Sequence, residues 1–340
     1  MKDRNDPPII GATRPLAGAC PVPRLLPLAL AALTAAALAG CVPHAPPEID
    51  LAETTHVPET CAVIFWVDGL GAGTFERMLE AGKLPNIRRY LVDRGVSVEG
   101  AVASLPTITY ANNVSLHTGM LPGHHDIVGN KWFDRHSLIF RNYNSIETYQ
   151  QVDADLADRT IYEALADELT ASILTPVRRG AGRNIDNWMS AGIAWYFGLQ
   201  ETVNTLTSAR FALISEVANA TGRWPRFVLA YFVTPDTMGH AEGVSSGAYE
   251  RMIVDVDEQI GHVCTSLERA GLLERTVLSL VSDHGFVDTP RHFHVAEYFR
   301  DRLGVPTIDK AYSPDAHLEE RVRHFDRARA VVVTGGDRRC

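Results

Sequence analysis

The chain has 340 residues, of which 46% are hydrophobic, so it can bury a large core, and one domain with insertions is expected rather than two small ones. Its formal net charge of −9 argues against a broad basic surface for nucleic acid or anionic lipid. Any phosphate that the protein handles must therefore be attracted locally, by a metal ion or a helix end.

The N-terminal segment has the pattern of an export signal. A short apolar run at residues 25–39 follows a segment with several Lys and Arg residues, and it closes on Leu-Ala-Gly-Cys41. Such a run is too short to span a bilayer comfortably and is typical of a signal peptide, here residues 1–40. The closing sequence resembles a bacterial lipobox, which would make Cys41 the lipidated first residue, and an ordinary secretory signal is the alternative. Residues 41–60 are Pro-rich and are predicted to be a tether.

Both interpretations of the signal predict export. Lipidation of Cys41 would hold the protein on a bacterial membrane, facing the periplasm or the cell exterior.

Residues 61–340 are predicted to form one catalytic domain. Three continuous apolar runs, at 61–67, 227–233 and 276–281, are typical of buried strands. Since helices separate them, the pattern favours an α/β fold with a largely parallel sheet. The other expected elements are helices at 75–81, 85–94, 160–169 (N-cap Thr160), 184–199, 206–220 and 247–270, strands at 97–103 and 171–176, and a hairpin or loop at 129–144. The helices at 184–199 and 206–220 are interpreted as an insertion or cap.

The cysteines offer no thiolate zinc site, because no CxxC pair occurs. Cys61 and Cys264 fall in a strand and a helix and are most simply interpreted as small buried apolar residues. A disulfide between them stays open for an exported protein.

The first polar cluster follows the first buried strand. Asp68-Gly69 ends that strand, and Thr109 and Asn112 lie at the start of a predicted helix about forty residues later. A carboxylate at a strand end and a hydroxyl at a helix N-terminus suit a metal-activated nucleophile that attacks phosphorus.

Two further clusters follow the other two buried strands. Asp236 and His240 are spaced four residues apart, and oxygen plus nitrogen ligands suit zinc. Asp283 and His284 are adjacent and reach one metal only if the backbone turns sharply, which Gly285 permits. Each cluster alone is a weak signal, but the carboxyl ends of parallel strands meet at one edge of a sheet.

In their order along the chain, these motifs resemble the alkaline phosphatase superfamily. Within it they resemble the branch of type I phosphodiesterases and nucleotide pyrophosphatases. The motifs are Asp68-Gly69, Thr109 through Asn112, Pro235 through His240 and Ser282 through Gly285, and the resemblance covers roughly residues 61–286. It implies an alkaline-phosphatase-like three-layer α/β/α sandwich with a helical insertion, and a site for two zinc ions.

The resemblance also implies the ligands of both ions. One zinc would be held by side chains of the first and third clusters, namely Asp68, Thr109, Asp283 and His284. The other would be held by Asp236, His240 and one more histidine. Thr109 would be the nucleophile that forms a phospho-threonine intermediate, and Asn112 would support a non-bridging phosphate oxygen. Thr107 is a rival nucleophile, but the family pattern puts its asparagine three residues after the threonine.

The sequence departs from the family pattern near its end. The family's further histidine lies far downstream of Asp-His-Gly, and the candidates here are His292, His294, His317 and His324. Residues 330–334 are typical of a strand entering a sheet, but the chain stops without the expected return. We therefore expect one zinc site to be incomplete.

The favoured function is a zinc-dependent phosphodiesterase or nucleotide pyrophosphatase that acts on a small-molecule phosphodiester or nucleotide. A phosphomonoesterase on the same fold is the nearest alternative. It is disfavoured because no arginine directly flanks Asp68 or Thr109 to hold a doubly charged phosphate. A sulfatase is disfavoured because threonine stands where those relatives have a modifiable cysteine. A lipid-anchored binding protein with a decayed metal site is a further alternative, although all six motif ligands are present.

Overall fold

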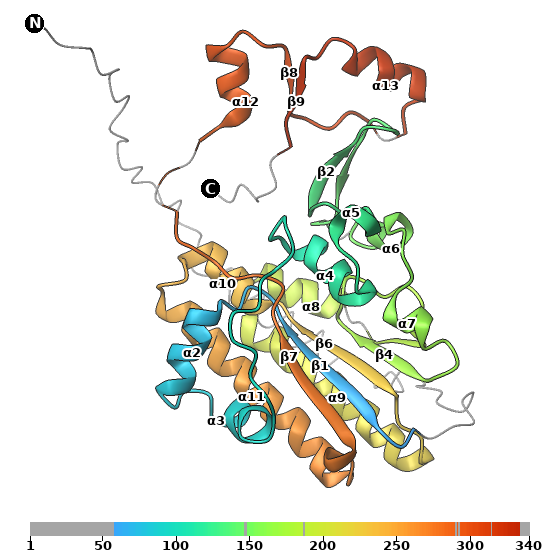
Figure 1. The fold of residues 1–340 in the computed structure, drawn as a ribbon, viewed down its shortest axis with the longest axis vertical. Helices are drawn as coiled ribbons and strands as arrows, with labels where there is room; N and C mark the ends of the chain where they lie inside the picture. Colours follow the sequence, from blue (N-terminus) through green and yellow to red (C-terminus); the bar gives the residue numbers. More distant parts are fainter. Residues whose placement is uncertain are drawn as a thin grey trace, which may run out of the picture. The chain divides into compact units, whose positions relative to one another are not determined.

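A parallel sheet forms the centre of the protein (Figure 1). The computed structural model describes residues 58–145, 148–185, 188–289, 291, 293–313 and 315–333. In this part of the chain the sheet has five strands in the order β5-β4-β6-β1-β7, and every neighbouring pair is parallel. Its strands are β1 (Cys61–Val67), β4 (Thr170–Ile173), β5 (Arg183–Ile185), β6 (Phe227–Phe232) and β7 (Thr276–Val281). The three strands predicted from apolar runs are confirmed, and β1 and β6 are buried as expected. Strand β7 is not buried as predicted: it lies at the edge of the described sheet and leaves Val277 57% exposed.

Helices cover both faces of this sheet. Along β1, Val63, Phe65 and Val67 pack into one core, and Ile64 and Trp66 pack into another, because successive side chains point to opposite faces. The first face is covered by the helices α2 (Ala72–Glu80), α3 (Pro85–Ile87), α9 (Gln200–Thr221) and α11 (Gly247–Arg269). The second face is covered by α4 (Thr109–Thr118) and α7 (Ile161–Ala164). The predicted three-layer α/β/α sandwich is confirmed.

Helix α11 follows its predicted amphipathic pattern. Its stripe of apolar side chains, Met252, Val256, Ile260, Val263 and Leu267, is buried. Ser246 caps its start by accepting a hydrogen bond from the N–H of Tyr249 at 3.2 Å.

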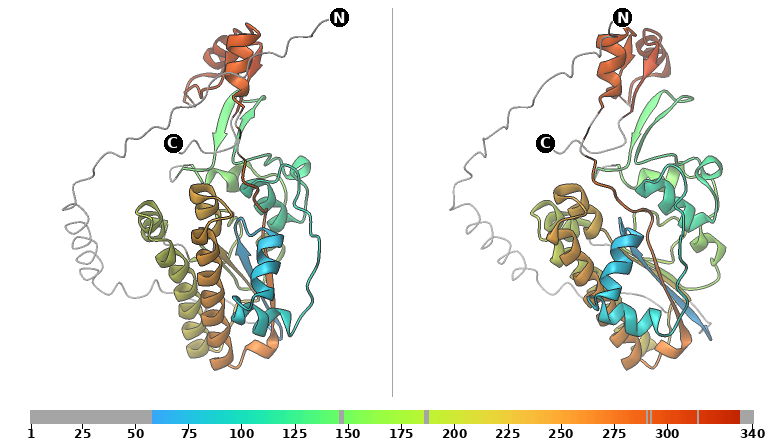
Figure 2. Two further views of the ribbon diagram at one scale, coloured as in Figure 1. Left: turned by 90° about the vertical axis from the view of Figure 1, so that its left-hand side faces the viewer. Right: turned by 60° about the vertical axis from the view of Figure 1, so that its left-hand side comes forward.

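Helix α9 corrects the prediction of an insertion or cap at 206–220. It begins at Gln200, lies alongside α11 and buries Phe211 and Ile214 in the core of the first face (Figure 2). Its Thr207 hydroxyl also donates to the carbonyl oxygen of Tyr231 on β6 at 2.9 Å. This helix is therefore part of the sandwich itself. Residues 184–199 also differ from the single predicted helix, since they end strand β5 and then form α8 (Trp188–Tyr196).

Two predictions of local secondary structure need correction. The predicted strand at 97–103 is wrong, because this segment pairs with no strand and exposes Val98 and Val102. The alternation of apolar and polar residues in this segment does not correspond to a face that is buried against another element. The predicted helix at 160–169 is only α7, although its predicted cap is correct: the Thr160 hydroxyl accepts from the N–H of Glu163, whose carboxylate accepts from the N–H of Thr160.

The remaining elements lie outside the sheet. The predicted hairpin is confirmed as antiparallel β2 (Lys131–Asp134) and β3 (Ile139–Asn142). The predicted strand at 330–334 exists as β9 (Ala330–Val331), but it pairs with β8 (Thr307–Ile308) in a separate two-stranded sheet. Short helices complete the described chain: α5 (Pro122–His125), α6 (Gln151–Asp155), α10 (Thr234–Glu242), α12 (Val295–Glu297) and α13 (Leu318–Phe325), with π-helical turns at Arg88–Val92 and Tyr298–Arg302 and a 3₁₀ turn at Leu273–Arg275.

Cys61 and Cys264 are buried free thiols, as the simpler interpretation predicted, and they form no disulfide. Burial raises the pKa of Cys61 to about 11 and that of Cys264 to about 12, which makes both unreactive. The predicted signal, Cys41 and the tether up to residue 57 lie outside the described residues. Within the described chain, helices of the length and apolarity that a bilayer span requires are absent.

The buried His117 of α4 predicts a specific acid sensitivity. Its Nδ1 bonds to the carbonyl oxygen of Asn113 at 2.8 Å, and burial lowers its pKa to about 4. Since this is below the value of about 6.5 in an unfolded chain, only the unfolded state takes up the proton as the pH falls from 6.5 to 4. Stability is therefore lost across that window.

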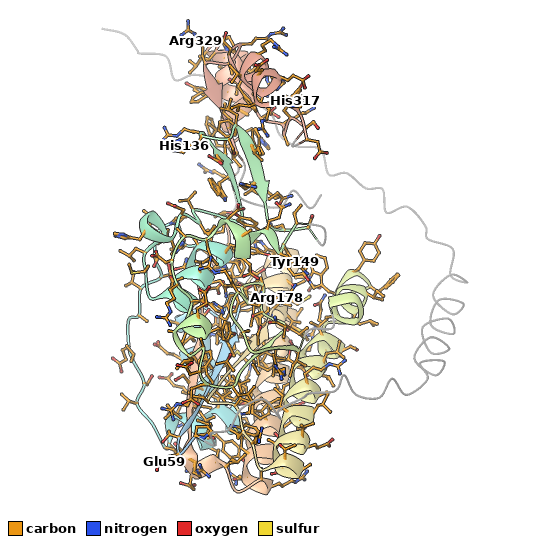
Figure 3. The ribbon with its side chains drawn as sticks, turned by 90° about the vertical axis from the view of Figure 1, so that its right-hand side faces the viewer. Glu59, His136, Tyr149, Arg178, His317 and Arg329 are labelled. Carbon is orange, nitrogen blue, oxygen red and sulfur yellow. The ribbon has the colours of Figure 1, made fainter. Side chains whose placement is uncertain are left out.

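We expect the free energy of unfolding of the parent, measured in urea without metal, to fall by about 2 kcal/mol more between pH 7 and pH 5 than that of His117→Phe. The control is His136→Phe, at an exposed position beside strand β2 (Figure 3), which should keep the parent's pH dependence. The prediction would be contradicted if the free energy of unfolding depended on pH in the same way for the parent and His117→Phe.

Candidate active site

Three acidic turns converge on the imidazole of His284. Its Nε2 lies 3.5 Å from Asp68 Oδ1, 3.5 Å from Asp283 Oδ2 and 3.9 Å from Asp236 Oδ1. These residues follow strands β1, β7 and β6, which are neighbours in the sheet and run parallel, so their carboxyl ends meet. The structure thus brings together the three clusters that the sequence placed at strand ends.

Thr109 faces the same imidazole from the second face of the sheet. It is the first residue of α4, after the extended residue Ile108, and its Oγ1 lies 3.2 Å from His284 Nε2. The hydroxyl therefore stands at the N-terminus of the helix, where the helix dipole adds positive potential. The rival Thr107 is exposed.

Helix α10 presents Asp236 and His240 one turn apart. Pro235 lies in its first turn, and His240 Nε2 is 3.5 Å from Asp236 Oδ1. The His240 side chain is 59% exposed, whereas that of His284 is 8% exposed. The ring of Phe286 meets both imidazoles edge-on, with centroids 4.8 Å from His240 and 5.5 Å from His284. Asp236 and His240 thus lie beside the buried side chains of Asp68, Asp283 and His284.

Gly69 allows these turns to approach one another. It has a φ of +67°, and a Cβ there would lie 2.5 Å from the Phe286 ring and 2.9 Å from the Asp236 backbone. Any other residue would push the turns after β1 and β6 apart.

Gly69→Ala should therefore reduce the free energy of unfolding by about 1–3 kcal/mol more than Gly82→Ala does. Gly82 is the matched control, because its φ is +70° but a Cβ there would meet nothing within 4 Å. Urea unfolding of both variants measures the difference, and equal losses would show that the close approach at Gly69 is not real.

The cluster fits a divalent cation. Asp68, Asp283 and His284 each offer a ligand atom within 4.8 Å of the others. Asp68 Oδ1 and Asp283 Oδ2 are buried without a hydrogen-bond partner in the described part of the chain. Burial and then the neighbouring charges of Asp283 and Asp236 raise the pKa of Asp68. A cation would remove this repulsion, and carboxylate oxygens with an imidazole nitrogen suit zinc.

No further histidine joins this cluster within the described residues. His317 begins α13, and His324 stacks on Tyr312 with centroids 4.3 Å apart. His294 precedes α12, and His292 lies outside the described residues.

Asn112 does not fit its predicted role as a phosphate ligand. Its Nδ2 donates to the carbonyl oxygens of Ser104, Pro106 and Ile108 at 3.0–3.2 Å, and its Oδ1 accepts from the N–H of Ser104 at 2.7 Å. All of its polar atoms are therefore used to order the loop before Thr109.

Asn130 is a candidate that the sequence reasoning missed. Its Oδ1 accepts from the N–H of Tyr110 at 2.8 Å, which holds the amide at the start of α4 beside Thr109. Among the described residues its Nδ2 has no hydrogen-bond partner, so that group can donate to a phosphate oxygen. In the sequence, the one signal for this role was the position of Asn130 immediately before the hairpin.

A cavity of about 200 Å³ adjoins Thr109 and Asp236. Its walls are mainly aromatic and apolar, and they include Tyr110, Tyr143, Tyr149, Pro176, Trp195 and Tyr231. The Arg178 guanidinium lies 5.5 Å from the centroid of the Tyr149 ring; both residues are labelled in Figure 3. The cavity suits a planar or apolar group next to the nucleophile.

The chain is similar in sequence to known pyrophosphatases and phosphodiesterases. It is 28% identical over 246 residues to human ectonucleotide pyrophosphatase/phosphodiesterase family member 5, covering 70% of this chain and 48% of that protein. It is 25% identical over 248 residues to an uncharacterised pyrophosphatase/phosphodiesterase of Schizosaccharomyces pombe, covering 69% of this chain and 46% of the relative. The chain thus spans about half the length of these curated relatives.

Solved structures share the fold. That of murine ectonucleotide pyrophosphatase/phosphodiesterase 5 gives a TM-score of 0.58 at 20% identity, covering 79% of this chain and 69% of that chain. An inactive variant of the same murine protein, in complex with AMP, gives 0.53 at 22% identity, covering 67% and 57%.

The family model for type I phosphodiesterases and nucleotide pyrophosphatases matches residues 62–334, which include the central sheet apart from Cys61, together with Thr109 and the three acidic turns. The chain therefore belongs to the type I phosphodiesterase/nucleotide pyrophosphatase family.

Proposed function

We propose that this chain is a zinc-dependent hydrolase that cleaves phosphodiester or pyrophosphate bonds, with Thr109 as its nucleophile. The observation that carries the proposal is the 3.2 Å approach of Thr109 Oγ1 to His284 Nε2, which three carboxylates surround. Membership of the family supports the same reaction class.

Two cation sites are proposed from the ligands present. Asp68, Asp283, His284 and Thr109 would hold one zinc ion, and Asp236 and His240 would contribute to the other. When bound, zinc supplies positive charge that lowers the pKa of a hydroxyl and stabilises negative charge developing on the reacting oxygens.

The side chains of the site have separate tasks in this proposal. Thr109 Oγ1 forms a bond to phosphorus as the bond to the leaving oxygen breaks, and water then displaces the threonine to release a phosphate monoester. The N-terminus of α4 adds positive potential beside Thr109, which favours anionic oxygens there. Asn130 takes the role first expected of Asn112 and donates its Nδ2–H to a non-bridging oxygen.

The proposed substrate is a small nucleotide or a related diester with a planar group. The aromatic cavity beside Thr109 has the character to hold such a group. The AMP complex of the murine neighbour agrees with a nucleotide ligand. None of the described residues that line the cavity is Lys or Arg, so the lining lacks the cation that would favour a dianionic monoester.

Hydrolysis of bis-p-nitrophenyl phosphate and p-nitrophenyl phosphate tests the choice of substrate. With zinc present, we expect a higher kcat/KM for the diester, because its single negative charge needs no additional cation. Faster cleavage of the monoester would support the phosphomonoesterase alternative. Zinc binding without hydrolysis of either compound would favour a binding protein.

A further inference from the structure

The two oxygens of Asp68 have different surroundings. The hydroxyl of Tyr231 donates a hydrogen bond to Oδ2. Oδ1 has no hydrogen-bond partner in the described chain and lies 3.5 Å from His284 Nε2. One oxygen is thus already engaged by the protein, and the other is free at the centre of the cluster.

Asp283 is divided in the same way. Its Oδ1 accepts from the N–H groups of Gly69 at 3.2 Å and His284 at 3.0 Å, while Oδ2 is buried without a hydrogen-bond partner and lies 3.5 Å from His284 Nε2. Backbone N–H groups thus bind Oδ1 of Asp283. The corresponding oxygen of Asp68, Oδ2, is bound instead by a side chain from another strand.

Tyr231 is itself held firmly on strand β6. The parallel register places it opposite Trp66, whose ring stacks on it with centroids 4.1 Å apart and an interplanar angle of 28°. Its carbonyl oxygen accepts from the Thr207 hydroxyl of α9 at 2.9 Å. The N–H of Asp68 donates to the carbonyl of Phe232 at 2.9 Å, so both partners of the bond share one rigid strand pair.

We propose that Tyr231 is a positioning residue that presents Asp68 to the cation through Oδ1 alone. The inference rests on the proposed function, because it requires a cation between Asp68, Asp283 and His284. A phenol has one proton to donate, and its bond to Oδ2 fixes the rotation of the carboxylate and opposes its use of both oxygens. Without the hydroxyl, Asp68 is free to rotate or to bind through two oxygens.

Tyr231→Phe isolates this effect, because it removes one oxygen and keeps the ring that stacks on Trp66 and lines the cavity. Zinc affinity of the purified chain, measured by competition with a chromophoric chelator, should fall by about 10–100-fold. The visible spectrum of the Co²⁺-substituted protein should also change, since it reports the coordination of the ion.

The matched control is Tyr162→Phe. Tyr162 is a fully buried tyrosine that packs against the same face of the sheet, at α7 and away from the cluster. We expect its zinc affinity and Co²⁺ spectrum to equal those of the parent. Urea unfolding of the metal-free variants shows whether each has kept its fold.

Unchanged zinc affinity and an unchanged Co²⁺ spectrum in Tyr231→Phe would overturn the proposal. A crystal structure of the zinc-loaded parent decides the matter even if the variant does not fold: Asp68 should bind through Oδ1 only, with Oδ2 on the Tyr231 hydroxyl. Coordination through Oδ2 or both oxygens overturns the inference. Zinc binding without hydrolysis overturns the proposed function alone, and a parent that binds no zinc overturns both.

Discussion

Replacing Thr109 with alanine should lower kcat for bis-p-nitrophenyl phosphate by at least about 10³-fold, because the atom that attacks phosphorus is removed. Thr109 Oγ1 is the hydroxyl that lies 3.2 Å from His284, at the start of α4. Zinc content should stay close to that of the parent, since Asp68, Asp283 and His284 remain. Steady-state kinetics and elemental analysis of the same preparation measure both quantities.

Thr107→Ala is the matched control, because this threonine lies only two residues before Thr109, outside α4, and is exposed. Its kcat should stay within about threefold of the parent value, as for a surface substitution outside the site. The assignment of Thr109 as the nucleophile would be contradicted by a Thr109→Ala protein with the parent's kcat, or by an inactive Thr107→Ala protein.

Removal of divalent metal should bring hydrolysis down to background, and added zinc should restore it. The physical reason is the concentration of negative charge: three carboxylates lie within 4 Å of one imidazole nitrogen, and two of their buried oxygens have no hydrogen-bond partner in the described chain. Zinc should also raise the melting temperature, because it binds the folded site. Dialysis against a chelator, followed by activity and thermal unfolding, measures these effects.

Asp283→Asn separates specific ligation from a general loss of charge. This variant should lose zinc affinity and activity, whereas Asp288→Asn should keep both. Asp288 lies in the same loop, but it is exposed and accepts its bonds from Val244 N–H and the Ser245 hydroxyl at 3.0 Å. Full activity after complete chelation, or equal damage in both variants, would contradict metal dependence.

The sequence by itself determined the sheet and the acidic turns that surround the site. Strands β1, β6 and β7 are continuous apolar runs, and all three form strands of the parallel sheet. Strands β1 and β6 are buried inside it, whereas β7 lies at the edge of the described sheet and is only partly buried. Because parallel strands gather their carboxyl ends, Asp68, Asp236 and Asp283 could be expected at one edge before any coordinates were known. The amphipathic stripe of α11 and the cap at Thr160 are likewise local signals.

Only the tertiary structure decided which side chains complete the site. Asn112 matched a short motif, yet its amide is used by the backbone of its own loop, and Asn130 reaches the start of α4 from another segment. Tyr231 has no local signature, since its bond to Asp68 spans 163 positions of the chain. Helix α9 and the segment at 97–103 also depended on which surfaces other elements covered. Periodicity reports the face that a segment buries, whereas hydrogen bonds between distant segments exist only once the strands and helices have packed together.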